Sequence, residues 1–318
     1  MSPLPSVFLQ RLTLLAGDHY ETILSTCVDK PTTFRCNTIR RDAVETYTEL
    51  ISLGFELEPV LWCRGAYVLR NKTKRELMST GSYTRGEIYL QSLASMVPPL
   101  LMDIEPNLRV LDMTAAPGSK TSQIAALMHK RGELVASEMS KVRFFKLQHN
   151  MHLLGVSDKQ DGWTLDLRYT DATKLVSKYP EYFDRVLLDA PCSAEARFDV
   201  NDEKSYGYWR EEKIREMASV QWSLLHAAFA LLRPGGTLVY STCTFAPEEN
   251  EYQISQFLNK VGQRAQLEMT RIDGLTAMPL VQQWNKKQIR DDVVERALRV
   301  LPTKDIEGFF IAKIKKQP

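Results

Sequence analysis

Short apolar segments alternate regularly with helical segments between residues 110 and 242. The apolar segments have the length and composition of buried strands and lie at 110–113, 133–137, 163–168, 183–189 and 237–242. Between them, apolar residues recur at helical spacing, most clearly over 121–130, 141–154 and 212–232. Parallel strands need long crossover connections, and helices usually provide them. The sequence therefore predicts an α/β fold with a Rossmann-like, doubly wound sheet.

The first expected strand leads into a turn that suits ligand binding. It ends at Asp112, and Pro117 and Gly118 then precede the helix expected from Thr121. A tight turn and a helix start both offer backbone N–H groups to a ligand. The turn contains one glycine, whereas dinucleotide-binding loops use several to approach a pyrophosphate, and its proline removes a donor. A ligand without phosphate is favoured over a nicotinamide dinucleotide.

Each later strand is also expected to end in polar residues. Ligands of doubly wound sheets bind at the carboxyl ends of the strands. Glu138 lies about 20 residues beyond the first turn, where a carboxylate can accept hydrogen bonds from ribose hydroxyls. Any single acid of this kind is more often a solvated strand end, but the ordered series indicates a binding edge. Its members are Asp112, Glu138, Asp171, the segment 189–192 and the segment 241–244.

The N-terminal part has a different pattern of apolar residues. Helical spacing over the first 30 residues and a mixed pattern from 33 to 85 predict helices followed by a small α+β unit. We therefore divide the chain into residues 1–85 and 86–318. Five basic residues and no acid lie between Pro59 and Arg75. They form either a solvated loop face or a patch that contacts RNA phosphates.

Composition narrows the class of protein. A net charge of +2 neither requires nor excludes nucleic acid. The five cysteines show neither zinc-site nor disulfide spacing, so no metal is expected. No signal sequence or membrane span is recognisable, and we expect a cytoplasmic protein with no membrane partner.

Two cysteines, Cys192 and Cys243, follow adjacent expected strands at the binding edge. Either one alone would more often be a small core residue. A thiolate can add to C6 of a pyrimidine, which activates C5 toward a methyl donor. Asp189, close to Cys192 in sequence, could stabilise the adduct at N3. The residues fit this scheme, although their spacing alone does not require it.

Several motifs resemble the Nop/Sun family of RNA cytosine-5 methyltransferases, and among its RsmB- and RsmF-like branches they are most similar to RsmF. The matching segments lie between about residues 33 and 312: 35–38, 89–91, 112–121, 189–193, 233–244, 247–251 and 308–310. The paired Pro-Cys and Thr-Cys-Thr motifs are the most specific.

The resemblance implies a class-I S-adenosylmethionine (AdoMet) methyltransferase that forms 5-methylcytidine in RNA. Cys243 would be the nucleophile, Cys192 would assist product release, and Asp189 would contact the base and lie near AdoMet. The family also implies that the unit at 33–85 is RNA-recognition-like. The other AdoMet-binding residues would be Thr114, Ala115, Ala116, Pro117, Gly118, Ser119, Lys120, Glu138 and Asp171.

The expected partner is structured RNA, with rRNA favoured over tRNA and an assembled ribosomal particle as an alternative form of the substrate. We expect a monomer. Ser119, Ala194 and Ala196 replace glycines common in the family, which bears on substrate choice and rate. Two other classes stay open: a non-catalytic RNA-binding or ribosome-assembly factor, which both cysteines argue against, and a DNA cytosine methyltransferase.

Overall fold

A mostly parallel sheet forms the centre of the protein, whose computed structural model describes residues 4–318. The strand order is β10-β14-β9-β8-β5-β6-β7, and β13 pairs with β14. The run from β9 to β7 is parallel, whereas β14 is antiparallel to β9, β10 and β13. The strands are β5 (Leu108–Asp112), β6 (Gly132–Glu138), β7 (Trp163–Tyr169), β8 (Phe183–Asp189), β9 (Leu232–Thr242), β10 (Ala265–Glu268), β13 (Leu298–Val300) and β14 (Phe309–Lys316).

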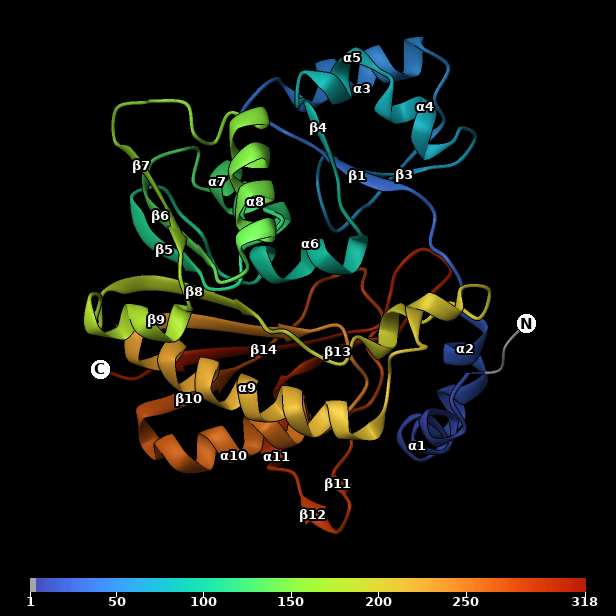
Figure 1. The fold of residues 1–318 in the computed structure, drawn as a ribbon, viewed down its shortest axis with the longest axis vertical. Coiled ribbons are helices and arrows are strands. Elements are labelled where there is room, and N and C mark those ends of the chain that lie inside the picture. Colours follow the sequence, from blue (N-terminus) through green and yellow to red (C-terminus); the bar gives the residue numbers. More distant parts are fainter. Residues whose placement is uncertain (1–3) are drawn as a thin grey trace.

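Helices cover both faces of this sheet, as Figure 1 shows. On one face lie α6 (Leu93–Leu100), α7 (Ser119–Leu127) and α8 (Lys141–Leu153), which bury residues such as Ile124 and Leu147 against it. On the other lie α9 (Glu211–Leu231), α10 (Glu251–Val261) and α11 (Asp291–Arg296), with Leu225 and Ile254 in the core. The predicted doubly wound α/β fold is therefore confirmed. The switch in strand order falls between β5 and β8, where ligand sites of such sheets form.

Helix α6 continues through Pro98 and Pro99, although prolines remove backbone donors. A residue other than proline at position 99 would donate its N–H to the Ser95 carbonyl. Here the Ser95 carbonyl accepts a hydrogen bond from Gln91 Nε2 at 3.1 Å instead. Two buried glutamines thus support the helix, because Gln123 Nε2 also donates to the Met96 carbonyl at 2.8 Å.

The N-terminal part contains a small antiparallel sheet of order β2-β3-β1-β4. Its helices begin at side-chain caps: Asp42 caps α3, and Thr73 forms a capping box with Glu76 at α4. The elements are β1 (Thr33–Cys36), α3 (Ala43–Ser52), β2 (Leu57–Pro59), β3 (Ala66–Leu69), α4 (Lys74–Met78), α5 (Gly81–Thr84) and β4 (Ile88–Leu90). Because β4 belongs to this sheet, the small unit extends to residue 90.

Helices α1 (Ser6–Ala16) and α2 (Tyr20–Ser25) lie apart from the small sheet. They pack in a third apolar cluster with Phe198, Trp209 and Phe245, which belong to the C-terminal part of the chain. The division into 1–85 and 86–318 stays a prediction, and residues 1–3 lie outside the described part. Short elements complete the chain: η1 (Gly17–His19), η2 (Ala172–Ser177), η3 (Glu195–Arg197), η4 (Glu203–Ser205), η5 (Gly262–Arg264), β11 (Gln283–Trp284) and β12 (Lys287–Gln288).

Buried polar contacts fasten the small sheet to the central one. Arg35 on β1 is 4% exposed and donates to the Ser119 carbonyl at 3.2 Å and to Ser122 Oγ, both in α7. Asn37 Nδ2 donates to the Leu154 carbonyl at 2.9 Å. The motif at residues 35–38 therefore joins the two parts of the molecule.

Part of the basic segment between residues 59 and 75 is used in structural contacts. Arg70 forms two hydrogen bonds with Asp305, at 2.7 and 2.8 Å, and one with Glu58. Lys72 Nζ donates to the Leu53 carbonyl at 2.6 Å and lies over the Phe55 ring. Arg64, Lys74 and Arg75 are exposed, so any RNA-contacting patch here depends on them.

Candidate active site

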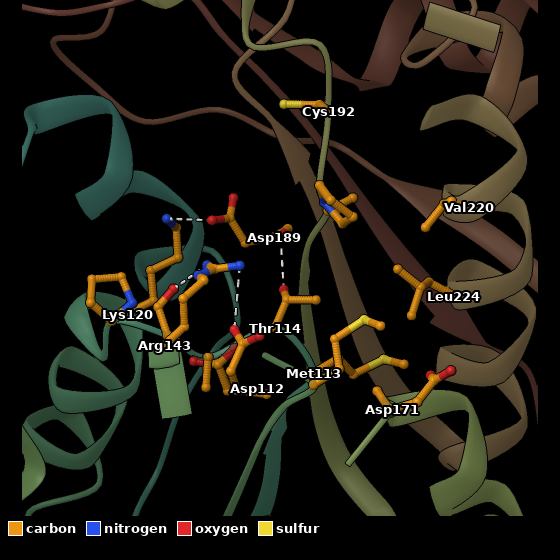
Figure 2. Close-up of a pocket in the computed structure, with 18 of the residues that line it drawn as sticks. Asp112, Met113, Thr114, Lys120, Arg143, Asp171, Asp189, Cys192, Val220 and Leu224 are labelled. Carbon is orange, nitrogen blue, oxygen red and sulfur yellow. Dashed lines mark hydrogen bonds and ion pairs between the residues drawn. The ribbon is translucent and has the colours of Figure 1, made fainter. Parts of the chain in front are cut away.

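A cavity of about 720 Å³ opens at the carboxyl ends of the parallel strands. Figure 2 shows its lining side chains, with Asp171 and Leu224 toward one end and Cys192 toward the other. Residues after β5, β6, β8 and β9 all contribute, together with one face of α9. Of the predicted site residues, Thr114, Ala115, Ala116, Pro117, Ser119, Lys120, Glu138, Asp171, Asp189, Cys192 and Cys243 line it.

Gly118 is the one predicted residue outside this lining, and its role is conformational. Its φ is +105°, and a Cβ there would lie 2.6 Å from Met151 Cε and 3.1 Å from Leu147 Cδ1. Only glycine adopts this backbone without strain while leaving room for α8. The turn thereby packs closely against α8, with the start of α7 beside the cavity.

Asp112, at the end of β5, is 1% exposed and lines the cavity. Its Oδ2 accepts a hydrogen bond from Thr121 Oγ1 at 2.7 Å, whereas Oδ1 has no partner among residues 4–318. Burial raises the pKa of this carboxyl to about 6. An unpartnered buried oxygen in a cavity wall is expected to meet a donor from a ligand.

The two carboxylates assigned to AdoMet from the family resemblance both face the cavity. Glu138 is held by the Ser140 N–H, which donates to Oε1 at 2.8 Å, and by Arg143, 3.4 Å from Oε2. Asp171 caps η2, where its Oδ1 accepts from the Thr173 N–H at 2.9 Å. These hydrogen bonds fix both side chains while oxygen lone pairs remain for a ligand.

Asp189, at the end of β8, is oriented by two contacts. Lys120 Nζ forms an ion pair with Oδ2 at 2.7 Å, drawn in Figure 2, and Ser241 Oγ donates to Oδ1 at 2.8 Å. Lys120 also donates to Ser95 Oγ at 2.7 Å. Sequence reasoning named Lys120 only as part of the loop; its pairing with Asp189 depends on the close approach of β5 and β8.

The sulfur atoms of Cys192 and Cys243 lie 3.4 Å apart at the end of the cavity next to Asp189. A hydrogen bond from the Cys192 thiol and the positive charge of Arg197 lower the pKa of Cys243. Donating that hydrogen bond raises the pKa of Cys192. The arrangement favours a thiolate at Cys243 and a thiol at Cys192, so one sulfur is poised as a nucleophile and the other as a proton donor.

The other three cysteines differ in both position and chemistry. Cys27, Cys36 and Cys63 are buried in apolar clusters, and burial raises their pKa values to about 11, 12 and 11. Desolvation of the thiolate makes such residues unreactive. Reactive thiol chemistry is therefore confined to Cys192 and Cys243 among residues 4–318.

A buried polar network behind the thiols was not predicted from the sequence. Glu249 is fully buried and accepts hydrogen bonds from Ser193 Oγ at 2.5 Å and Gln221 Nε2 at 2.7 Å. Glu195 accepts from Thr244 Oγ1 at 2.9 Å. These carboxylates tie the segment after Cys192 to the segment after Cys243. The motif at 247–251 was the only sequence signal, and nothing in it revealed this contact.

Ala194 occupies a position where glycine would fit more easily. Its φ of +58° and ψ of +30° lie in the left-handed region, which costs a residue with a Cβ roughly 1 kcal/mol. The glycine common in the family at this position avoids that cost. Ala194 nonetheless lines the cavity, as Cys192 does.

Residues 99–315 match the family described as 16S rRNA methyltransferase RsmB/F. The chain belongs to this family. It is 35% identical over 323 residues to ribosomal RNA small subunit methyltransferase F of Aeromonas hydrophila, and 36% identical over 289 residues to the protein of that name from Shewanella loihica.

These alignments cover 98% and 89% of this chain, but only 64% and 56% of the two relatives. A solved structure described as a methyltransferase homologue from Pyrococcus horikoshii superposes with a TM-score of 0.83 at 29% identity, covering 98% of this chain and 95% of that one. RsmB/F membership confirms the resemblance inferred from the motifs. It does not test the individual site residues.

Two features are absent from residues 4–318. No helix combines the length and the apolar character needed to cross a membrane. No group of three or more His, Cys, Asp or Glu side chains is arranged to hold a metal ion.

Proposed function

We propose that the protein is an AdoMet-dependent RNA cytosine-5 methyltransferase that forms 5-methylcytidine, with 16S rRNA as its substrate. The observation that carries this proposal is the pair of sulfurs, 3.4 Å apart, at one end of a ligand-sized cavity beside the Lys120–Asp189 ion pair. Membership of the RsmB/F family and the names of the curated relatives support rRNA over tRNA.

The cavity fits AdoMet at the end away from the sulfurs. The unpartnered Asp112 Oδ1 and the carboxylates of Glu138 and Asp171 offer acceptors for amino and hydroxyl groups, while Met139 and Leu224 offer apolar contacts. Glu138 would hold the ribose, Asp171 would lie near adenine, and the segment 114–120 would hold the rest of the molecule. When bound, AdoMet supplies an electrophilic methyl group.

The sulfurs and Asp189 would act on a cytosine that has left its base stack. The Cys243 thiolate would form a bond to C6, and the π electrons of the C5–C6 double bond would shift toward C4 and N3. C5 would then take the methyl group, with the demethylated sulfide as the leaving group, and a base would remove the C5 proton. The electron pair of the broken C5–H bond would restore the C5–C6 double bond as the sulfur–C6 bond breaks. Cys192 assists this release, and Asp189 with Lys120 would stabilise the ring at N3.

The remaining proposals concern partners and organisation. The small sheet with its exposed Arg64, Lys74 and Arg75 would be an RNA-recognition-like unit beside the catalytic one. We place the protein in the cytoplasm as a monomer, acting on naked rRNA or on an assembled particle.

Methyl transfer from labelled AdoMet tests the proposal directly. Wild-type protein should place label in 5-methylcytidine of 16S rRNA, offered naked and as small-subunit particles, with tRNA and DNA as comparison substrates. Cys243→Ala should lower the rate by at least a thousandfold and still bind AdoMet. Cys192→Ala should accumulate a covalent RNA adduct, seen as a retarded band on denaturing gels.

Each outcome separates a different alternative. Label in tRNA or DNA alone would reassign the substrate. Undiminished transfer by Cys243→Ala would remove it as the nucleophile. AdoMet binding without transfer to any of these substrates would favour an RNA-binding or ribosome-assembly factor.

A further inference from the structure

Arg197 is a cation at the sulfur end of the cavity that the reaction scheme above does not use. It lies in η3, five residues after Cys192, and its exposed side chain lines the cavity. Across residues 4–318, no hydrogen bond or ion pair engages its guanidinium group. The two other basic residues lining the cavity are both paired: Lys120 with Asp189, and Arg143 with Glu138.

The surroundings of Arg197 locate it beside the reacting sulfur. Its charge interacts with Cys243 first, and also with Asp189 and Cys192. Glu307 also attracts it, but without a hydrogen bond, and the guanidinium donors therefore remain available. An arginine held in the open with five donors is suited to an anion with several oxygens, and a phosphodiester is such an anion.

Tyr208 is an exposed aromatic residue near the same end of the cavity. The turn that carries it packs on the segment after Cys192, because Phe198 contacts both Tyr206 and Trp209, and Trp209 Nε1 donates to Glu195 at 3.2 Å. The Tyr208 hydroxyl lies within electrostatic range of Cys243 and Arg197, and the side chain is 59% exposed. Exposed aromatic rings beside cations are typical of surfaces that hold single-stranded nucleic acid.

The geometry of a nucleotide entering the cavity explains both residues. A base that reaches Cys243 with its C6 atom leaves its own phosphates at the cavity rim, where Arg197 is exposed. The neighbouring base stays outside, where a ring can stack on it. We propose that Arg197 and Tyr208 form a rim subsite that binds the phosphodiester group and the adjoining base of the target nucleotide. This rests on the proposed function, since it requires a nucleotide at Cys243.

Binding of RNA, measured separately from methyl transfer, tests the subsite. With an in vitro transcribed 16S rRNA, Arg197→Ala should raise the Kd about tenfold and reduce the slope of log Kd against log salt by about one. Arg197→Lys should keep the slope and recover part of the affinity. Tyr208→Phe should bind like wild type, whereas Tyr208→Ala should lose about tenfold. AdoMet affinity should stay unchanged in all four.

Arg131→Ala is the matched control, because Arg131 is an exposed arginine next to the start of β6, at the opposite edge of the sheet. It should leave the Kd and the salt slope unchanged. A second readout distinguishes an electrostatic role from a structural one. Losing the positive charge at 197 should move the acid limb of the kcat/KM profile to higher pH, since Arg197 lowers the pKa of Cys243.

The outcomes separate this inference from the proposed function. Wild-type Kd and salt slope in Arg197→Ala, with methyl transfer intact, would overturn the rim subsite alone. RNA binding by wild type without methyl transfer would overturn the proposed function. The RNA affinities of Arg197→Ala and Tyr208→Ala would still decide whether the rim contacts RNA. Equal losses in Arg131→Ala and Arg197→Ala would also overturn the subsite, because they would show a general effect of charge.

Discussion

At the scale of single residues, the site is built from polar side chains that are buried and matched to one another. Glu249 contacts no part of the cavity, yet its carboxylate accepts hydrogen bonds from Ser193 N–H and Oγ and from Gln221 Nε2. Ser193 follows Cys192 directly, and Ser193 Oγ lies 2.6 Å from Thr244 Oγ1, next to Cys243. One buried acid therefore sets the relative position of the two thiols.

Glu249 should also give the protein a pH-dependent stability. Burial raises its pKa from 4.5 to about 8, with a further contribution from the nearby Glu195. Because the folded-state pKa lies above the unfolded one, the folded state favours the protonated acid. Its stabilising contribution is complete below about pH 4.5 and is lost as the pH rises through about 8.

Glu249→Gln removes this titration while keeping an oxygen that can accept a hydrogen bond. The free energy of unfolding, measured with urea from pH 5 to 9, should fall less steeply for the variant than for wild type. Each pKa unit corresponds to about 1.4 kcal/mol, so the difference should be easily measured. Parallel curves for the two proteins would contradict the assignment.

At the scale of helices and strands, the sequence predicted the central sheet well, because its inner strands β5, β6, β8 and β9 are largely buried apolar segments. The predicted helix at 141–154 is α8 (Lys141–Leu153), and the predicted strand at 183–189 is β8. The polar residues at the strand ends could be predicted because each one directly follows such an apolar segment. The contacts of Gln123 with α6, and of Arg70 with Asp305, could not, since each joins segments that are separated in sequence and approach one another only through packing.

Helix α1 shows how a peripheral element supports the site. Phe8 is 1% exposed, and its ring lies 4.9 Å from Phe198 and 6.0 Å from Trp209. Arg11 pairs with Glu248 at 2.7 Å. The helix therefore packs on the segment after Cys192 and is tied to the motif at 247–251. Sequence periodicity predicted the helix but not this position.

Phe8→Ala should lower the free energy of unfolding by about 3 kcal/mol, the usual cost of removing a buried aromatic ring. The rate of methyl transfer should fall as well, because Phe198 loses its support, while AdoMet affinity should stay constant. Leu14→Ala, on the exposed face of the same helix at 76% exposure, is the control. If Phe8→Ala weakened AdoMet binding as much as it slowed methyl transfer, α1 would not act through the segment after Cys192, and this prediction would be contradicted.

At the scale of the whole molecule, Arg35 connects the small sheet to the start of α7, beside the cavity. This arginine is buried and has no carboxylate partner among residues 4–318, and burial lowers its pKa to about 10. Its hydrogen bonds go to Gln91 at 2.8 Å and to Ser119 and Ser122 in the first turn of α7. That turn continues the segment 114–120, so the expected RNA-binding unit and the expected AdoMet-binding loop share one side chain.

Arg35→Met keeps a long side chain of similar reach and removes these hydrogen bonds. The Ser119 carbonyl would lose this donor, and the start of α7 would be held less firmly. AdoMet binding, measured by calorimetry, should weaken by roughly tenfold, which corresponds to about 1.4 kcal/mol. Arg75→Met is the control, since Arg75 is an exposed arginine in the same small unit but far from α7 in the packing. Arg35 does not itself line the cavity and reaches it through Ser119. A loss of affinity confined to this variant would therefore mean that the small sheet positions the segment 114–120. An unchanged affinity would mean that the two parts of the molecule act independently.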